Sequence, residues 1–494
     1  MKIVVIDDDP TGSQTVHGCP LLLRWDEQSL SEGLHHPSPL LFILANTRAL
    51  GPKDAAHRIR AICTALRQAK ASLGLEGWLL VSRGDSTLRG HFPLEVEVMQ
   101  EELGPFDATL LVPAFLEGGR TTVDGVHWVQ GVEAHRTEFA RDRLFGYRNS
   151  FLPAWVEEKS GGRLRASDVE RIGLAELEEG SCPGDGGVQA QQHLVTRLEG
   201  LQGNPVVVVD AERPQHLAAL GGAMRTLMEP RAGHRRERPH RFLFQSAASL
   251  LNGLANLPPQ PLGRQALADL RRKRIGGASA QELKQDSQHS IVLPGLVLVG
   301  SHVPLADVQL KRLLEQPECG GVELQVPQLQ RMLEGPMPNR LLEAMEAAWE
   351  EQLQEVLVSE RTPVFFSSRR EAACRHADER RALGVTIARL MGRVVARLAP
   401  NLGYVISKGG ITTHTLLAEG LQLGAVNLMG QLLPGLSLVL TPGGGGDTPG
   451  ATGRGGIAGA ERLPVITFPG NLGESHTLVE AWRWMEGMDH LDAR

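Results

Sequence analysis

Three consecutive aspartates, residues 7–9, follow a short apolar run at the start of the chain and precede Pro10, Thr11 and Gly12. A single aspartate at the end of a strand is ordinary turn chemistry. Three carboxylates in a row repel one another unless a metal ion, cationic side chains or substrate hydroxyls offset their charge. Because open α/β sheets bind ligands at the carboxyl ends of their strands, we interpret this cluster as part of a binding or catalytic site.

A second polar segment, VSRGDSTLRGHF at residues 81–92, follows another apolar run and carries charges of both signs. Guanidinium forks match planar carboxylates, whereas Asp and Ser side chains suit sugar hydroxyls. Two glycines allow the backbone to approach a ligand closely. The segment therefore indicates a site for a polyhydroxy acid, with the candidate residues Arg83, Gly84, Asp85, Ser86 and Arg89.

Two more polar loops follow apolar runs in the same half of the chain. ANTR, at residues 45–48, supplies Arg48, and PAFLEGGRTT, at residues 113–122, supplies Arg120. One such loop could be ordinary surface, but four at the ends of four successive core strands favour a single site. We expect Arg48 and Arg120 to join Asp8 and Asp9 there.

The elements that would position these loops are short, continuously apolar runs rich in β-branched residues, as expected for strands covered on both faces. The runs occupy residues 3–6, 40–45, 78–82, 109–113 and 205–210 in the first half and 295–300, 363–368, 403–410 and 463–471 in the second. Amphipathic segments at 52–73 and 339–356 predict helices. Strands that alternate with helices predict an α/β protein of two domains, each with a mostly parallel sheet flanked by helices.

A chain of 494 residues is too long for one hydrophobic core. Between about residues 230 and 290 the composition shifts to Pro, Gly, Arg and Gln, interrupted by an expected helix over 244–254. We therefore predict an N-terminal domain at 1–250, a connection at 251–290 and a C-terminal domain at 291–494.

The bulk properties exclude several classes of function. The net charge is −6, and the basic clusters at 231–241 and 271–274 have no interleaved aromatic residues, which argues against a nucleic-acid partner. Five scattered cysteines favour a reducing compartment. No signal peptide or membrane span is evident, so we expect a cytoplasmic protein without a membrane partner. The oligomeric state, including a homo-oligomer, stays open.

The most literal match to the first motif is a phosphatase. Asp-x-Asp-x-Thr after a strand opens the haloacid-dehalogenase-like phosphatases, with Asp7 as the nucleophile and Asp9 as the acid/base. Gly84-Asp85-Ser86 echoes a later element of that family, but Arg89 and Gly90 stand where a further aspartate is expected. A phosphatase also leaves the second domain unexplained.

Taken together, the motifs resemble the four-carbon acid sugar kinase family over roughly residues 1–250 and 290–485. The resemblance rests on Asp-Asp-x-Thr-Gly, on Arg-Gly-Asp-Ser-Thr-Leu-Arg-Gly at 83–90, on Pro-Ala-Phe…Gly-Arg-Thr-Thr, and on the late Lys-Gly-Gly-Ile-Thr and Pro-Gly-Asn-Leu-Gly. It implies phosphorylation of threonate, erythronate or 3-oxo-tetronate by ATP. It also implies that the N-terminal domain binds the acid, with Asp9, Arg48 and residues 83–86 in contact with it.

The second half contains no Gly-x-x-x-x-Gly-Lys-Ser/Thr, which excludes a P-loop kinase. Three strand ends carry glycines instead, and a strand, a Gly-Gly turn and a helix together can bind phosphate. By resemblance, the nucleotide-binding residues are Ser301, Lys408, Gly409, Gly410, Ile411, Thr412, Gly470 and Asn471. We interpret the Gly-rich stretch at 441–456 as an insertion without a direct role.

The mechanism that we expect is in-line transfer of the ATP γ-phosphoryl group, which needs positioning more than covalent chemistry. Arg48, Arg83 and Arg120 would hold the carboxylate and the incoming phosphate. Asp9 would orient or deprotonate the hydroxyl, with Asp85 as the second candidate for the catalytic role. Mg²⁺ would bridge the phosphates with few protein ligands. The alternatives are the phosphatase and a sugar-acid sensor without turnover.

Overall fold

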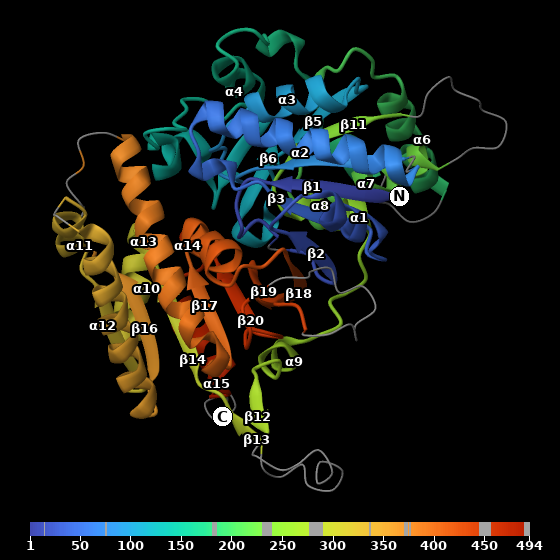
Figure 1. Cartoon of the computed structure of the whole chain (residues 1–494). Coiled ribbons are helices and arrows are strands. Elements are labelled where there is room, and N and C mark those ends of the chain that lie inside the picture. The colour runs from blue at the N-terminus through green and yellow to red at the C-terminus, as the bar shows by residue number, and fades with distance from the viewer. Residues whose placement is uncertain are drawn as a thin grey trace, which may run out of the picture. The chain divides into compact units, whose positions relative to one another are not determined.

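The computed structural model describes the chain except for residues 14, 75–76, 180–184, 230–239, 276–289, 335–336, 370–373, 375–376, 444–455 and 489–494. It divides into two compact units, Met1–Pro259 and Gln260–Arg494. Each unit is built on its own run of parallel strands flanked by helices (Figure 1). The predicted α/β fold is confirmed.

The first unit contains a parallel sheet in the order β2-β3-β1-β4-β11-β5-β10-β9. Its central strands are completely or almost completely buried, as their continuous apolar sequences predict. The strands are β1 (Lys2–Asp7), β2 (Cys19–Leu22), β3 (Leu40–Leu44), β4 (Trp78–Arg83), β5 (Ala108–Val112), β9 (Glu170–Ile172), β10 (Val206–Val209) and β11 (Phe242–Ser246).

Helices connect these strands, and α2 (Pro52–Leu73) illustrates why they form. Pro52 sits at the first helical position, and Gly74 ends the helix in the left-handed conformation at φ 60°. The apolar stripe predicted from the sequence is buried, including Ile59, Ile62 and Leu66. The other helices are α1 (Glu27–His35), α3 (Leu94–Leu103), α4 (Leu152–Lys159), α5 (Leu174–Glu179), α6 (Asp185–Glu199), α7 (Pro214–Met228) and α8 (Ser249–Ala255). A small antiparallel sheet of β6 (Arg120–Val123), β7 (Val126–Val129) and β8 (Val132–Glu133) follows β5.

One element of the first unit differs from the prediction. The helix expected over 244–254 begins only at Ser249, and residues 242–246 form the central strand β11 instead. This strand pairs with both β4 and β5, so it belongs to the core of the sheet rather than to a connection. Because of this wrong prediction, the sequence analysis did not include the end of β11, which lies at the same edge of the sheet as the predicted site residues.

The second unit contains a sheet in the order β15-β16-β14-β17-β20-β19-β18. The first five strands are parallel, and β19 and β18 add to the edge in antiparallel pairs. The strands are β14 (Gly295–Val299), β15 (Cys319–Leu324), β16 (Thr362–Ser367), β17 (Tyr404–Lys408), β18 (Ala425–Leu433), β19 (Leu436–Leu440) and β20 (Pro464–Phe468), beside a separate hairpin of β12 (Lys273–Ile275) and β13 (Ser290–Val292).

The helices of the second unit include the one predicted over 339–356, which is α12 (Pro338–Val358). The others are α9 (Arg264–Ala268), α10 (Pro304–Leu314), α11 (Val326–Leu333), α13 (Ala377–Leu398), α14 (Gly410–Thr415) and α15 (Thr477–Glu486). No helix within the described ranges is long and apolar enough to cross a membrane. Most of the Gly-rich stretch and part of the predicted connection lie outside the described residues.

Candidate active site

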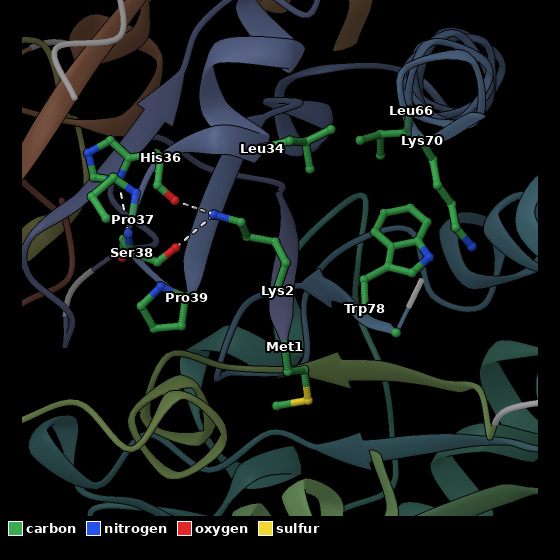
Figure 2. A pocket seen from close by; sticks show the side chains of 11 residues that line it. Met1, Lys2, Leu34, His36, Pro37, Ser38, Pro39, Leu66, Lys70 and Trp78 are labelled. Carbon is green, nitrogen blue, oxygen red and sulfur yellow. Dashed lines mark hydrogen bonds between the residues drawn. The ribbon is translucent and has the colours of Figure 1, made fainter. Parts of the chain in front are cut away.

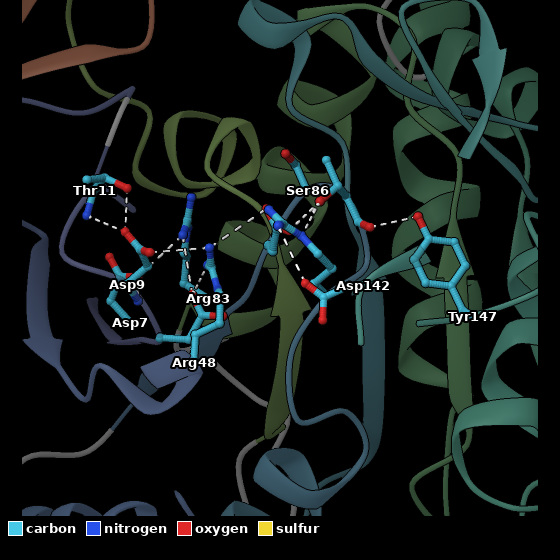
Figure 3. A network of polar contacts seen from close by, with 12 residues as sticks. Asp7, Asp9, Thr11, Arg48, Arg83, Ser86, Asp142 and Tyr147 are labelled. Atoms are coloured by element: carbon cyan, nitrogen blue, oxygen red, sulfur yellow. Dashed lines mark hydrogen bonds and ion pairs between the residues drawn. The ribbon is translucent and has the colours of Figure 1, made fainter. Parts of the chain in front are cut away.

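The polar loops of the first unit meet because their strands are neighbours in the sheet. Asp7, the last residue of β1, lies level with Leu44 at the end of β3 and with Arg83 at the end of β4. The loops that follow therefore start at the same edge. Figure 3 shows side chains from the three loops joined in one polar network.

Asp8 and Arg48 form the centre of this network. The Arg48 Nε donates to Asp8 Oδ2 at 3.0 Å, and its Nη2 donates to Asp8 Oδ1 at 2.5 Å, a fork-to-fork ion pair. The Asp8 side chain is only 3% exposed, and burial raises its pKa against the opposing charge of Arg48. The same guanidinium reaches Asp9 Oδ2 at 3.3 Å and Asp85 Oδ1 at 4.0 Å. One cation thus holds three carboxylates together.

Asp9 is the most exposed of the four carboxylates in the cluster, at 16% of its side chain. It accepts hydrogen bonds from the backbone N–H of Thr11, at 2.8 Å, and from the Thr11 hydroxyl. Burial alone would raise its pKa, but Arg48 and these hydrogen bonds hold the pKa of Asp9 below its ordinary value. Asp9 is therefore an ionised carboxylate that a ligand can reach.

Asp85 is held by its own loop. Its Oδ2 accepts from Arg89 Nε at 2.7 Å and from the hydroxyl of Thr87. Although burial opposes ionisation, Arg89 and Arg48 hold the pKa of Asp85 well below its usual range. The Arg89 guanidinium also lies over the ring of Phe139, 5.1 Å from its centroid. Asp85 and Arg89 thus form a fixed pair beside the Arg48 cluster.

Asp7 has a different environment from the other aspartates. Its side chain is 1% exposed, and burial raises its pKa to about 7. Arg83 Nη1 lies 3.5 Å from Asp7 Oδ1 and 3.4 Å from Asp8 Oδ1. A Cβ at Gly12 would lie 2.1 Å from Asp7 Oδ1, so only glycine lets the loop close over this carboxyl. Asp7 is therefore shielded from a substrate.

The remaining candidates of the first unit also lie at this edge. The backbone N–H of Gly84 donates to the carbonyl of Ser246 at 2.8 Å, and the carbonyl of Ser86 accepts from His127 Nε2 at 2.7 Å. Arg120 is 6% exposed and donates to the carbonyl of Gly118 at 2.5 Å. Burial lowers the pKa of Arg120, and the charge of Asp85 acts in the opposite direction.

The structure also brings in side chains that the sequence analysis did not identify. Glu95 of α3 is 2% exposed, accepts a hydrogen bond from the hydroxyl of Thr47 and interacts electrostatically with Asp8. Burial, reinforced by Asp8, raises the pKa of Glu95 to about 7. Gln245 and Ser246 end the unpredicted strand β11. A glutamate in the first turn of a helix gave no sequence signal, because the residues that it contacts come from loops distant in the sequence.

In the second unit, the glycine-containing loops after β14, β17 and β20 lie close together, because these three parallel strands are neighbours in the sheet. A Cβ at Gly300 would lie 2.0 Å from the Thr412 Oγ1, and one at Gly470 would lie 2.3 Å from the Ser301 Oγ. Gly409 adopts φ 119°, which side-chain-bearing residues avoid, and lies against the backbone of Ser301. Gly410 and Ile411 begin α14, and Asn471 follows β20. Three backbone loops thus approach one another closely at the carboxyl edge of this sheet.

The side chain of Lys408 is buried beside these loops and is not exposed to solvent. It is fully buried, and its Nζ donates to the carbonyl of Pro469 at 2.9 Å while lying 3.7 Å from the centroid of the Phe468 ring. Burial lowers its pKa well below the ordinary value. Its contact ties the end of β17 to the loop after β20. A direct bond from Lys408 to a phosphate stays a prediction.

Arg369, which the sequence analysis did not identify, supports the same loops. Both of its Nη atoms donate to the carbonyl of Ser301, one at 2.9 Å, and its Nε lies 3.1 Å from Asp307 Oδ1. His302 Nε2 lies 3.1 Å from the Ser367 hydroxyl. These contacts fix the loop that follows β14.

A pocket of about 390 Å³ lies at the opposite, amino-terminal edge of the first sheet (Figure 2). Lys2 Nζ donates there to the carbonyls of His36, at 2.6 Å, and Ser38, at 2.8 Å. Lys70 lies over the Trp78 ring, 5.4 Å from its centroid. None of the predicted site residues line this pocket.

Comparison with known families matches both units. Residues 3–254 match a family model described as a sugar-binding N-terminal domain, and residues 296–478 match one described as a nucleotide-binding C-terminal domain.

Two similar proteins are named as kinases. The chain is 30% identical to a D-erythronate kinase of Heliobacterium modesticaldum over 227 residues, which are 44% of this chain and 47% of that protein. It is 25% identical to a D-threonate kinase of Bordetella bronchiseptica over 97% of this chain and 96% of that protein. A solved structure of a Salmonella typhimurium LT2 protein shares the fold, with a TM-score of 0.59 and 17% identity over 98% of this chain and 99% of that one.

Proposed function

The chain belongs to the four-carbon acid sugar kinase family, and from that premise we propose that it transfers the γ-phosphoryl group of ATP to a hydroxyl of a four-carbon sugar acid. The first candidates for the acid are D-erythronate and D-threonate, which the names of the two relatives contain. The observation that carries the proposal is the cluster of Asp8, Asp9 and Asp85 around Arg48. It offers acceptors for hydroxyls and a cation for an anion within one small volume.

We assign the sugar acid to the first unit and ATP to the second. The first unit holds the mixed carboxylate and guanidinium cluster, which suits a polyhydroxy acid. The second unit holds the converging glycine loops, where backbone N–H groups can approach phosphate. The domain limits of 1–250 and 291–494, joined by 251–290, stay part of this proposal.

Asp9 is our candidate for the residue that receives the substrate hydroxyl. Its carboxylate is ionised and more exposed than those of Asp8 and Asp85, so it can accept the hydroxyl proton or orient the hydroxyl for attack. Its hydrogen bonds from Thr11 fix its orientation. Asp85 is the second candidate, but Arg89 and Thr87 already occupy one of its oxygens.

The guanidinium groups would hold the anionic parts of the reaction. Arg48 has 19% of its side chain exposed and Arg89 has 18%, against 5% for Arg83. We therefore assign the contact with the substrate carboxylate or the transferred phosphate to Arg48 and Arg89. Arg83 is more deeply buried, and we assign it the role of compensating the negative charge of Asp7 and Asp8.

We assign Mg²⁺ to the ATP phosphates rather than to a protein-built site. Within the described ranges, no three His, Cys, Asp or Glu side chains are arranged to hold a metal ion. The oxygens of the aspartate cluster are engaged by guanidinium and hydroxyl groups instead. When bound, the ion would neutralise phosphate charge.

The rival phosphatase reaction has little support in this geometry. It would need Asp7 as the attacking group, and Asp7 is 1% exposed beneath Gly12. The sensor without turnover keeps the same acid site, so only an activity measurement separates it from the kinase.

The test is an assay of purified protein with ATP, Mg²⁺ and a panel of four-carbon sugar acids, beside a sugar phosphate without ATP. We expect ADP formation that depends on one or a few acids. Release of phosphate from the sugar phosphate without ATP supports the phosphatase, and stabilisation by an acid without turnover supports the sensor.

Asp9→Asn tests the assigned role of the carboxylate. We expect turnover to fall by at least about 10²-fold while the affinity for ATP is retained. The matched control is Asp54→Asn, which changes an exposed aspartate in the first turn of α2. Activity of Asp9→Asn equal to that of Asp54→Asn would remove Asp9 from the mechanism.

A further inference from the structure

The unpredicted strand β11 brings two more polar side chains to the edge where the aspartate cluster lies. Its last residues, Gln245 and Ser246, lie level with Ser82 and Arg83 of β4. A Cβ at Gly84 would lie 2.4 Å from the Gln245 amide nitrogen, so the absence of a side chain at 84 lets the amide lie there. Both residues are buried, at 9% and 2% exposure.

Two atoms of these residues have no hydrogen-bond partner among the described residues, namely Gln245 Oε1 and Ser246 Oγ. Buried polar atoms are nearly always paired, because an unpaired one loses its hydration without replacement. Two such atoms on the last two residues of one strand therefore point to a ligand that supplies the missing hydrogen bonds.

A small cavity of about 20 Å³ lies where both residues can meet such a ligand. Asp8 and Asp85 line it together with Gln245 and Ser246, and Phe92 and Trp155 contribute apolar wall. The volume admits roughly one water-sized group and not a whole sugar acid. The cavity therefore fits a single substituent of a larger ligand.

The charges around the cavity select the kind of substituent. The carboxyl groups of Asp8, Asp85 and Glu95 outnumber the one guanidinium group in the lining, which belongs to Arg89 and is paired with Asp85 on this side. A carboxylate or phosphate is therefore disfavoured inside the cavity, whereas a hydroxyl could donate to these acceptors. A hydroxyl enclosed beside Phe92 and Trp155 cannot also meet the phosphoryl group, so it is not the reacting one.

We propose that this cavity receives one non-reacting hydroxyl of the sugar acid, and that Gln245 and Ser246 are substrate-binding residues that determine specificity through it. The inference rests on the proposed function of the same site. It adds that the site recognises one particular hydroxyl group of the substrate. A site that hydrogen-bonds a substrate hydroxyl rejects an analogue without it, because its own polar groups are then left unpaired.

The test compares kcat/KM for the acid that the wild-type protein uses with kcat/KM for its 2-deoxy and 3-deoxy analogues. We expect the wild type to disfavour one of the two analogues by at least about 100-fold. Ser246→Ala removes one oxygen atom and should reduce that preference by about 10-fold, and Gln245→Leu should act in the same direction. The KM for ATP should stay unchanged in both variants.

Ser38→Ala is the matched control, because Ser38 is a buried serine at the amino-terminal edge of the same sheet. Melting temperatures show whether each variant is folded. A wild-type preference that Ser246→Ala and Gln245→Leu leave intact would mean that the cavity holds only structural water, and it would overturn the inference while the kinase stands. Absence of ATP-dependent turnover in the wild type would overturn the proposed function and this inference together.

Discussion

Replacement of Arg48 by methionine should destabilise the first unit in a pH-dependent way. The substitution removes the fork on Asp8 and leaves Asp9 and Asp85 without the cation that they share. Removing one partner of a buried ion pair costs about 3–5 kcal/mol. We expect the lower end, about 3 kcal/mol, because Arg48 is 19% exposed and Asp8 can take up a proton. For a unit of this size, that corresponds to a fall in melting temperature of roughly 6–12 °C.

The pKa of Asp8 determines how the loss of stability in Arg48→Met changes with pH. Burial raises the pKa of Asp8 above its unfolded value, and loss of Arg48 raises that pKa further. A carboxyl group whose pKa is raised on folding contributes stability at low pH that is lost as the pH rises. The deficit of Arg48→Met relative to the wild type should therefore be larger at pH 8 than at pH 5.

Thermal unfolding followed by calorimetry at both pH values measures the deficit. Arg60→Met is the control, because Arg60 is 45% exposed and its ion pairs with Glu101 and Glu102 are open to solvent on the arginine side, which makes them worth at most about 1 kcal/mol. An Arg48→Met deficit no larger than that of Arg60→Met, or one that is equal at pH 5 and pH 8, would refute the reasoning.

Three further predictions concern the two sites. Gly470→Ala places a Cβ 2.3 Å from the Ser301 Oγ and should raise the KM for ATP by at least about 10-fold, whereas Gly263→Ala, with open space around it, should not. Lys408→Met should leave the melting temperature unchanged or higher, because a buried ammonium is replaced by an apolar chain, yet should weaken ATP binding in calorimetric titration. Glu95→Gln keeps an acceptor for Thr47 and should flatten the decline in melting temperature as the pH rises from 5 to 8, because the pKa of Glu95 is raised to about 7.

Most of the first sheet was predictable because its strands are short, continuously apolar and bounded by turn residues. The run over 242–254 was not, because FLFQSAASLLNGL contains a strand and a helix with no proline and no early glycine between them. Periodicity alone cannot separate a short buried strand from part of a buried helix. The sequence analysis therefore missed Gln245 and Ser246 as neighbours of Gly84.

The chemistry of the site was predictable in residue type but not in pairing. Aspartates at one strand end and arginines at two others indicate mutual compensation. Which arginine meets which aspartate depends on the register of β1, β3 and β4 and on loop conformation. The sequence gives no sign that Arg48 would bridge three carboxylates or that Lys408 would lie buried against Phe468.

The mutual pairing of aspartates and arginines suggests why a sugar acid suits this site better than a simple acid or a neutral sugar. A simple carboxylate would compete with Asp8, Asp9 and Asp85 for Arg48 and leave them uncompensated. A neutral sugar could donate hydroxyls to those aspartates but would leave the guanidinium group without a new partner. A sugar acid brings hydroxyl donors for the carboxylates and an anion for Arg48 in one molecule, so each contact that it breaks is replaced. We infer that this double replacement, rather than an excess of positive charge, determines the class of substrate.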